Sequence, residues 1–577
     1  MIQRRACPDE KEHVMSVVKK FAVLAATAAL SVTVVACGGS AGSGVNANGG
    51  GGDTAKSLAA QSQYNPQPYD NVKDGGTLTT ALPEISTQWN PFQGNATGYS
   101  QTLWNWYNPV LTTFSTDGKP AFNPDYLIDV KADTVNGNSR ITYTINPKAA
   151  YNDGSPIDWT AFQATWKADN AQNKDYIVNS SDGYNRIASV TKGVDDRQAI
   201  VTFNGFNVWW QGLFGILLNP KALDPQVFNK GYIDTPHPEW GAGPYTVQKF
   251  DKQNGTVVFT RNPKWWGKKG KLDTRIFLAM EPTASINAFK NGQIDGTSVA
   301  TKDRLAQVQG MSGIDIRKGI SLQTDLFTLN SRSPILADPQ VRKAVFEGID
   351  RKQIADITFQ GLNFTETLPG SLNLFSFQDG YQDNFAKAVT FNVQKAKQDL
   401  ESAGWTAGPD GMRSKGGQPL EFSYVNTGDD PVGKAIAGAM VAMLKNVGVK
   451  LDIRQVPTAD FSSIISGRKF DMFYSSIVQN DPFGMAYICQ LYCSDSQLNL
   501  SGTNDPAFDP QVKSVNTLPT AQEQFAKGAD VEAQAFKTYG IMPTLTLPAI
   551  TAVKHGLANY GSARFFTTTP ENIGWQK

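Results

Sequence analysis

The chain has few of the side chains on which catalytic centres and metal sites most often depend. Among 577 residues there are three histidines, His13, His237 and His555. This number leaves little for a histidine-rich metal site or for a catalytic centre that uses histidine as its base. No G-x-S-x-G elbow, H-E-x-x-H pair, P-loop or G-x-G-x-x-G turn stands in the strand–helix context that these motifs require. We therefore expect a protein that binds without catalysis and has no cofactor and no metal; an exported glycosidase-like hydrolase is the disfavoured alternative.

The overall charge excludes another class of function. Lys and Arg together number 53, and Asp and Glu number 52, so the formal net charge is +1. A general nucleic-acid binder would need a clustered cationic face, so we expect no nucleic-acid partner. The hydrophobic content of 40% is enough for a sizeable core and excludes wholesale disorder.

An N-terminal segment predicts export. Residues 21–35 form a run of apolar and small side chains that follows Lys19 and Lys20. Its 15 residues are few for a bilayer span, which takes about 20, so the basic start and the short apolar run indicate a secretory signal. The run ends in V-V-A-C, which resembles the bacterial lipobox, and we expect residues 1–36 to be removed and Cys37 to carry lipid. The alternatives are a signal peptide with an incidental cysteine and a short anchor helix.

The first 14 residues do not fit this signal. They carry mixed charge and contain Pro8, whereas Met15 opens a better basic segment, so we hypothesise that translation starts at Met15. Residues 37–68 would comprise the lipidated Cys37 and a flexible linker rich in Gly, Ala, Ser and Asn. The expected location is the outer face of the cytoplasmic membrane, with membrane contact through the lipid alone.

Two cysteines lie close together near the C-terminal end. Cys489 and Cys493 are four residues apart in the sequence C-Q-L-Y-C. An exported chain meets an oxidising environment, so we favour a local disulfide, although sequence alone does not give the distance between the two residues. Free thiols are the main alternative. A metal site is disfavoured, because this spacing is not a standard zinc pair and no histidine is nearby.

Residue patterns predict a mixture of strands and helices. The predicted strands are residues 76–82, 140–145, 199–203, 256–260, 420–425, 449–456 and 470–477. The predicted helices are residues 159–169, which Asp158 would cap, and residues 339–359, 393–403 and 432–447. Strands and helices alternate between residues 393 and 477, which favours an α/β lobe with partly parallel pairing.

Several short motifs occur in an order that is informative as a set. They are G-G-T-L at residues 75–78, D-G-K-P at 117–120, Y-N-D-G-S-P at 151–156, G-A-G-P-Y at 241–245 and R-N-P-K-W-W-G at 261–267. In this order they resemble the solute-binding proteins of dipeptide/oligopeptide-type ABC importers, of the actinobacterial lipoprotein type. The resemblance extends across residues 75–510.

This resemblance implies a fold class. It is an α/β, two-lobed periplasmic-binding-protein-like clamp of type II, similar to cluster C, with an extra subdomain and two hinge strands near residues 326–329 and 541–550. Lobe I would comprise residues 69–110, 235–328 and 545–577. The extra subdomain would be residues 111–234, and lobe II residues 329–544.

The resemblance also implies a function. The protein would be a monomeric extracytoplasmic receptor that captures short peptides between its lobes and delivers them to ABC permease subunits. The alternatives are the same role for an oligosaccharide, a haem-like compound or a modified peptide, and a non-transport receptor or chaperone on the same fold.

Capture in this family resembles strand addition, so the main chain of the ligand carries much of the affinity. In many members an Asp four residues before a proline pairs with the ligand's ammonium group. The matching position here is Val478, and only Asp481 remains before Pro482. Either Asp481 binds the amine instead, or the ligand has no free amino terminus there, or the match is shifted.

The expected ligand-binding residues combine this segment with aromatic and polar positions. They are Asn90, Trp106, Tyr107, Trp240, Tyr474, Ser475, Ser476, Val478, Gln479, Asn480 and Asp481. Core packing is the alternative role for Trp106 and Tyr107. The neighbouring pairs at residues 209–210 and 265–266 are expected to pack rather than to bind.

Overall fold

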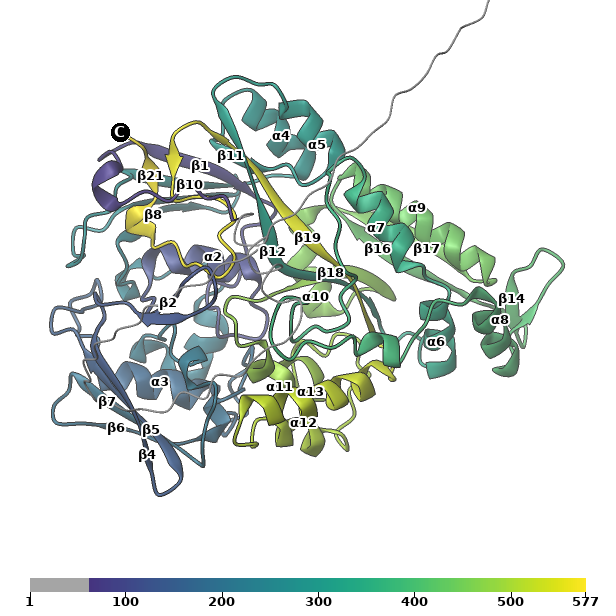
Figure 1. Ribbon diagram of the computed structural model, residues 1–577, viewed down its shortest axis with the longest axis horizontal. Coiled ribbons are helices and arrows are strands. Elements are labelled where there is room, and N and C mark those ends of the chain that lie inside the picture. Colours follow the sequence, from purple (N-terminus) through teal and green to yellow (C-terminus); the bar gives the residue numbers. More distant parts are fainter. Residues whose placement is uncertain (1–61) are drawn as a thin grey trace, which may run out of the picture. The chain divides into compact units, whose positions relative to one another are not determined.

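The computed structural model describes residues 62–577, which belong to one compact unit (Figure 1). The predicted signal peptide, the start at Met15, the lipidated Cys37 and most of the linker lie outside the described residues. In the described part, no helix is long and apolar enough to cross a membrane. Below, lobe I, the extra subdomain and lobe II denote the residue ranges given above.

A ten-stranded sheet runs through both lobes in the order β17-β16-β18-β12-β19-β11-β1-β10-β9-β8. The lobe I strands are β1 (Thr77–Leu82), β8 (Tyr245–Asp251), β9 (Thr256–Arg261), β10 (Thr274–Ala279) and β11 (Gly296–Ser298). The lobe II strands are β16 (Glu421–Thr427), β17 (Lys450–Val456) and β18 (Met472–Val478). The pairing of β16 is parallel with both β17 and β18, which confirms the predicted partly parallel lobe.

Two long strands join the halves of this sheet. β12 (Ile314–Leu329) and β19 (Ile541–Lys554) pair side by side in antiparallel fashion across the middle of the unit (Figure 1). Their register shifts between Ile320 and Thr324, and again between Asp325 and Leu326. Such irregularities bend a strand, so the connection is most easily deformed between the lobe I and lobe II ends of this pair.

The extra subdomain has its own sheet and core. Its four antiparallel strands, in the order β4-β5-β7-β6, are β4 (Leu127–Val135), β5 (Asn138–Ile145), β6 (Ile187–Lys192) and β7 (Gln198–Phe203). The helix α3 (Trp159–Asp169) packs on them, and the Asp158 carboxylate caps it by accepting from the Thr160 amide at 2.9 Å. The predicted helix and cap are therefore confirmed. A separate hairpin joins β2 (Thr112–Phe114) to β3 (Pro120–Phe122).

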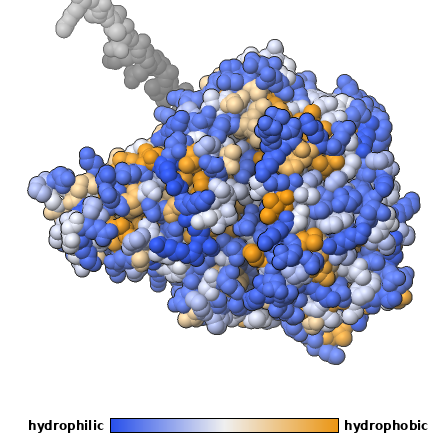
Figure 2. Space-filling model, turned by 180° about the vertical axis from the view of Figure 1, so that it is seen from behind, coloured by the Kyte–Doolittle hydropathy of each residue, from blue (hydrophilic) through white to orange (hydrophobic). Residues whose placement is uncertain are grey.

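The apolar side chains form several separate clusters rather than one. The three largest correspond to lobe II, to lobe I and to the extra subdomain. Leu218, Phe228 and Tyr232 pack into the lobe I cluster, although the predicted subdomain extends to residue 234. Figure 2 shows that hydrophobic residues appear on the viewed face in separate groups among hydrophilic ones.

The helices lie mainly in lobe II and partly contradict the sequence prediction. The single helix predicted for residues 339–359 is wrong, because the structure has α6 (Pro339–Glu347) and α7 (Arg351–Phe359). Gly348 ends the first, and the Asp350 carboxylate caps the second by accepting from the Lys352 amide. The other lobe II helices are α8 (Val393–Ser402), α9 (Pro431–Asn446), α10 (Phe461–Gly467), α11 (Ile488–Tyr492), α12 (Asp509–Val515) and α13 (Ala521–Phe536). Lobe I contributes α2 (Gly98–Tyr107), α4 (Pro282–Lys290) and α5 (Lys302–Val308).

Short strands complete the fold. They are β13 (Thr406–Ala407), β14 (Arg413–Lys415) and β15 (Gln418–Pro419) in one small sheet, and β20 (Leu557–Ala558) with β21 (Gly574–Trp575) in another.

Candidate ligand-binding cavity

A cavity of about 470 Å³ lies where lobe I, the extra subdomain and lobe II meet. Its lining residues come from positions 91–114, 169–216 and 461–500, with a few from β12 and β19 and with Leu372 and Thr567. This volume is within the usual range for small-molecule sites, roughly 300–1,000 Å³. The cavity is therefore the candidate ligand-binding site of the described chain.

One edge of β18 borders the cavity without a neighbouring strand. β18 pairs with β12 over its whole length but with β16 only at Met472 and Phe473. From Ser475 to Val478 the strand lines the cavity. Backbone groups along that edge can therefore pair with an extended ligand.

The loop after β18 continues the same wall. Gln479, Asn480 and Asp481 line the cavity, as do Ser475, Ser476 and Val478 among the predicted site residues. The Gln479 side-chain amide donates to the Asn373 carbonyl at 3.1 Å, which fixes the loop against lobe II. The segment that the family resemblance indicated is thus the one the structure brings to the cavity.

Asp481 uses both of its carboxylate oxygens within the loop. Oδ1 accepts from the Phe483 amide at 2.7 Å, and Oδ2 accepts from the Tyr487 hydroxyl at 2.5 Å. Burial nevertheless raises the pKa of Asp481 to about 6, against the effect of these two donors. The carboxylate holds the turn, and ligand binding by Asp481 stays a proposal.

Tyr474 lies beside the cavity wall, but its side chain bonds to a second carboxylate, that of Asp325. Its hydroxyl donates to the Asp325 carboxylate at 3.1 Å, and Ser476 donates to the same carboxylate at 2.6 Å. Burial raises the pKa of Asp325 despite these donors. Tyr474 therefore supports the wall from behind and does not line the cavity.

The predicted residues of lobe I pack in its core instead of lining the cavity. Trp106 lies between the Tyr245 ring at 5.3 Å and the Arg275 guanidinium at 5.1 Å, and it is 6% exposed. The Tyr107 hydroxyl donates to the Pro236 carbonyl at 2.7 Å. Core packing was the stated alternative for both, and their placement corrects the expectation of ligand contact.

The same correction applies to Asn90 and Trp240. The Asn90 side chain is fully buried and bonds to the Phe228 carbonyl and the Phe92 amide. The Trp240 ring stacks on the His237 ring at 3.8 Å. Neither is among the residues that line the cavity.

Other side chains of lobe I line the cavity and were missed. Gln101 and Asn105 lie one turn apart on α2, and the Gln101 amide donates to Asn105 at 2.6 Å. An i, i+4 pair of amides on a helix that also carries Leu103, Trp104 and Trp106 is a signal that could have located them.

The extra subdomain supplies two carboxyl groups that sequence reasoning also missed. Asp182 is 5% exposed and accepts from the Gln490 amide of lobe II at 2.7 Å, and burial raises its pKa to about 7. Asp169, the last residue of α3, is 2% exposed, and neither of its oxygens has a hydrogen-bond partner within the described residues. An acid at a helix C-terminus opposes the helix dipole, and this was the available signal.

The described lining of the cavity is acidic. Asp169, Asp182 and Asp481 are its carboxyl groups, and no Lys, Arg or His is among the lining residues of the described chain. Electrostatically, this wall favours a neutral or positively charged ligand over an anion.

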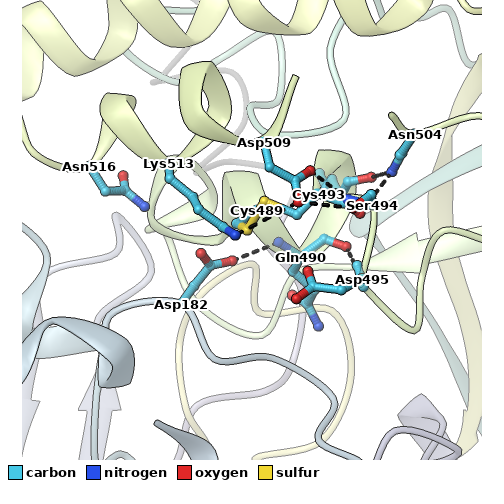
Figure 3. The surroundings of a disulfide bond; sticks show 12 residues. Asp182, Cys489, Gln490, Cys493, Ser494, Asp495, Asn504, Asp509, Lys513 and Asn516 are labelled. Atoms are coloured by element: carbon cyan, nitrogen blue, oxygen red, sulfur yellow. Dashed lines mark hydrogen bonds and ion pairs between the residues drawn. A yellow bond between two sulfur atoms is a disulfide. The ribbon is translucent and has the colours of Figure 1, made fainter. Parts of the chain in front are cut away.

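A disulfide lies directly behind this wall. The sulfur atoms of Cys489 and Cys493 are bonded across the short helix α11, next to the contact between Gln490 and Asp182 (Figure 3). Cys493, Asp495 and Asp509 are close enough to hold a metal ion, but the Cys493 sulfur is already bonded. The disulfide thus supports the segment of lobe II that meets the extra subdomain.

Further hydrogen bonds join lobe II to the other parts. The Glu281 carboxylate of lobe I accepts from the Thr458 amide at 2.8 Å, and Glu84 accepts from the Ser462 hydroxyl at 2.9 Å. On the other side of the cavity, the Trp209 ring nitrogen of the extra subdomain donates to Gln524 at 2.6 Å. These contacts hold the cavity walls together, so the conformation is closed.

Comparisons with known proteins agree with this arrangement. Residues 128–499 match the model of bacterial extracellular solute-binding proteins, family 5 Middle. The oligopeptide-binding protein OppA of Mycobacterium tuberculosis (strain ATCC 25618 / H37Rv) is 32% identical over 545 residues, covering 91% of this chain and 89% of that protein. The chain belongs to family 5 of the bacterial extracellular solute-binding proteins, as the resemblance predicted.

Solved structures show the same fold. The periplasmic EDTA-binding protein EppA has a TM-score of 0.75 at 23% identity, covering 90% of this chain and 99% of that one. The oligopeptide-binding protein AppA of Bacillus subtilis, in complex with a nonapeptide, has a TM-score of 0.74 at 17% identity. The match covers 88% of this chain and 100% of that chain. The predicted two-lobed α/β clamp is therefore confirmed.

Proposed function

We propose that this protein captures short peptides in the cavity and delivers them to an ABC permease. The observation that carries the proposal is the edge of β18 from Ser475 to Val478, which lines the cavity and lacks a neighbouring strand there. An extended peptide can pair with such an edge as an added strand, so that its main chain provides affinity whatever its side chains are. The relationship to an oligopeptide-binding protein over most of both chains supports the same role.

The rest of the lining suits variable side chains. Five of the lining residues with side-chain amides, among apolar and small ones, are Gln101, Asn105, Gln211, Gln490 and Gln497. Amides both donate and accept hydrogen bonds, directly or through water, so they adapt to different ligand side chains.

Capture would be coupled to closure. A peptide that touches β18 of lobe II and α2 of lobe I binds the closed form better than an open one, and it therefore shifts the population toward closure. The register shifts in the β12–β19 pair give the lobes a place to bend. The permease would then receive the closed, loaded receptor.

The remaining parts of the proposal concern location. We propose that Cys37 carries the lipid, that the receptor acts as a monomer at the outer face of the cytoplasmic membrane, and that it performs no catalysis. The basic and apolar residues 19–35 before Cys37 support export.

A metal–chelate ligand is the obvious alternative, since the relative EppA is an EDTA-binding protein. EDTA complexes are anionic in most states, and an anion would meet Asp169, Asp182 and Asp481 without any cationic side chain in the described lining. The lining therefore disfavours an anionic chelate.

Strand addition can be tested on the ligand, without altering the protein. We would measure calorimetric affinities for alanine-based tetrapeptides and pentapeptides in which each backbone nitrogen is methylated in turn. Because strand pairing uses alternate residues, methylation at every second position should weaken binding tenfold or more, and the positions between should tolerate it. If no peptide binds, or if methylation has no periodic effect, the proposed mode is wrong.

A further inference from the structure

The hydrogen bonds at the two ends of β18 show which of its residues direct their main chain to the free edge. The Gln479 amide donates to the Leu322 carbonyl at 2.9 Å, and the Asn330 amide donates to the Asp471 carbonyl at 2.8 Å. Both bonds follow the antiparallel register of β12 with β18. Because the bonding direction alternates along a strand, the odd-numbered residues of β18 bond to β12. The even-numbered residues direct their backbone groups to the opposite edge.

Ser476 and Val478 are the even-numbered residues at the open part of that edge. β16 pairs with β18 only at Met472 and Phe473, so no strand of the described chain pairs with Ser476 or Val478 on that side. Both residues line the cavity. A peptide added as a strand would therefore bond to the backbone N–H and C=O groups of these two residues.

One buried carboxylate holds the side chain of Ser476. The Ser476 hydroxyl donates to the Asp325 carboxylate at 2.6 Å, and the Gln323 amide donates to the same carboxylate at 3.0 Å and to the Ser476 hydroxyl at 2.7 Å. The Tyr474 hydroxyl donates to the other carboxylate oxygen at 3.1 Å. Asp325 is 4% exposed and is not among the residues that line the cavity, so it acts on a ligand only through its neighbours.

The environment of Asp325 is costly for a carboxyl group. All three of its side-chain donors are neutral, and burial raises its pKa despite them. An apolar side chain at this place would avoid the cost of desolvation. An ionised carboxylate, however, accepts at both oxygens and fixes the direction of several donors at once. This balance indicates that the network serves to place β18.

Asp325 also lies at the bend of the connection between the lobes. The register of β12 with β19 shifts directly after Asp325, where Thr544 is an extra residue of β19 (Figure 1). The buried Thr544 hydroxyl donates to the Asp325 carbonyl at 2.9 Å and to the Tyr474 hydroxyl at 3.3 Å. A bulge of this kind is where a strand bends. Asp325 is thus bonded on one side to the hinge and on the other to the strand that borders the cavity.

We propose that Asp325 is a positioning residue for peptide capture: it fixes Ser476, whose main chain pairs with the peptide, relative to the hinge. The inference rests on the proposed function and specifies how its binding edge is kept in place. Supporting contacts of this kind preorganise a binding group, because the group does not have to be ordered by the ligand. Loss of Asp325 would leave the edge present but less ordered.

The first test needs no ligand. We would follow hydrogen exchange by mass spectrometry in the fragment 474–480 of the ligand-free, full mature protein. Asp325→Ala and Ser476→Ala should each speed exchange in this fragment at least tenfold, because the backbone bonds from β18 to β12 would open more often. Asp315→Ala is the matched control and should stay within twofold, since Asp315 is an acid of the same strand that accepts from Arg317 at 3.2 Å and lies outside the cavity lining.

The second test uses alanine-based tetrapeptides and pentapeptides that each carry one backbone N-methyl group. In the unaltered protein, one methylated position should show the largest loss of calorimetric affinity. Asp325→Ala should reduce this loss at least threefold, because a displaced edge bonds less well to that N–H group. A general weakening of the fold would instead lower the affinities of methylated and unmethylated peptides by the same factor.

A double variant shows whether Asp325 acts through Ser476. Asp325→Ala and Ser476→Ala should each weaken binding of the unmethylated peptide at least fivefold, and the double variant should stay within twofold of Ser476→Ala alone. If Asp325→Ala does not fold, Asp325→Asn takes its place. Its amide offers one acceptor oxygen instead of two, so exchange and affinity should change in the same directions by at least twofold.

The outcomes are distinguishable. Unchanged exchange in the fragment 474–480, or losses of affinity that add fully in the double variant, would overturn the positioning role and leave peptide capture standing. An equal effect of Asp315→Ala would also overturn it. Failure of every peptide to bind to the unaltered protein would instead remove the proposed function, and this role with it.

Discussion

Asp182 lines the cavity, and its carboxylate also joins two parts of the fold. It accepts a hydrogen bond from the backbone amide of Gln490, across the gap between the extra subdomain and lobe II. Its burial raises the pKa from 3.8 in a free side chain to about 7. The folded state therefore holds this proton more tightly than the unfolded chain. For an acid with a raised pKa, the linked stability is present at low pH and is lost as the pH rises from about 4 to about 7.

We predict that Asp182→Asn flattens this loss of stability. Between pH 4 and pH 8 the free energy of unfolding should decrease in both proteins. The decrease should be smaller in the variant, by roughly 1–4 kcal/mol. Asn keeps an acceptor oxygen for the Gln490 amide, so the contact across the gap is preserved. Urea unfolding at several pH values measures the effect, and parallel curves for the two proteins would contradict it.

The sequence predicted only some of the residues that line the cavity. Six of the expected residues line the cavity, because the motif before Pro482 marks the end of a strand next to the cleft; they are Ser475, Ser476, Val478, Gln479, Asn480 and Asp481. Trp106 and Tyr107 were misassigned because an aromatic run on a helix fits a core as well as a pocket, and only packing against Tyr245 and Pro236 decides between them. For Asp169, an acid at a helix C-terminus is a local signal, but it does not show that the residue lines a cavity, because that depends on which parts of the fold enclose it.

Among the elements, the short helix α11 carries Gln490, which contacts Asp182 across the gap between lobe II and the extra subdomain. It has five residues, and the Cys489–Cys493 bond spans it. A helix of this length has little stability of its own, so its position depends on the bond and on neighbouring α12 and α13.

We predict that replacing both Cys489 and Cys493 by Ala lowers the free energy of unfolding by about 2 kcal/mol, because the unfolded chain gains freedom. Peptide affinity should fall as well, since Gln490 meets Asp182 from this helix. Denaturant unfolding and calorimetry measure the two effects. Dithiothreitol should reproduce them in the original protein and leave the double variant unchanged; equal midpoints for all samples would disprove the prediction.

Periodicity predicted most elements well because the patterns are local. β9, α8, α9 and β17 lie within a residue or two of their predicted ranges. The helix predicted for residues 339–359 was wrong because its apolar residues keep helical spacing across Gly348, while the Asp350 cap starts a new helix there. β12 pairs with β19 over most of its length, although the paired residues are more than 200 positions apart in the sequence. No local pattern encodes such a pairing.

On the scale of the whole unit, a few hydrogen bonds hold the closed form. Glu281 of lobe I accepts from both the amide and the hydroxyl of Thr458 in lobe II, at 2.8 and 2.9 Å. Because the closed form is the one that encloses ligand, loss of these bonds reduces its population and thereby the apparent affinity.

We predict that Glu281→Ala increases the radius of gyration of the ligand-free protein and weakens peptide binding several-fold, which corresponds to about 1 kcal/mol. Small-angle scattering and calorimetry provide the measurements. Glu421→Ala is the matched control, because that carboxylate pairs with Lys450 inside lobe II. A scattering profile identical to that of the control would show that Glu281 does not stabilise closure.

The pair of adjacent strands between the lobes limits how they can separate. β12 and β19 are bonded to each other on both sides of their shifts in register, so the two crossings cannot slide apart or move independently. Lobe opening is thereby restricted to a bend and twist about one short axis. The angle between the two lobes is therefore the one quantity that separates the ligand-bound receptor from the empty receptor. An importer can recognise the bound receptor by this angle, whatever the sequence of the bound peptide.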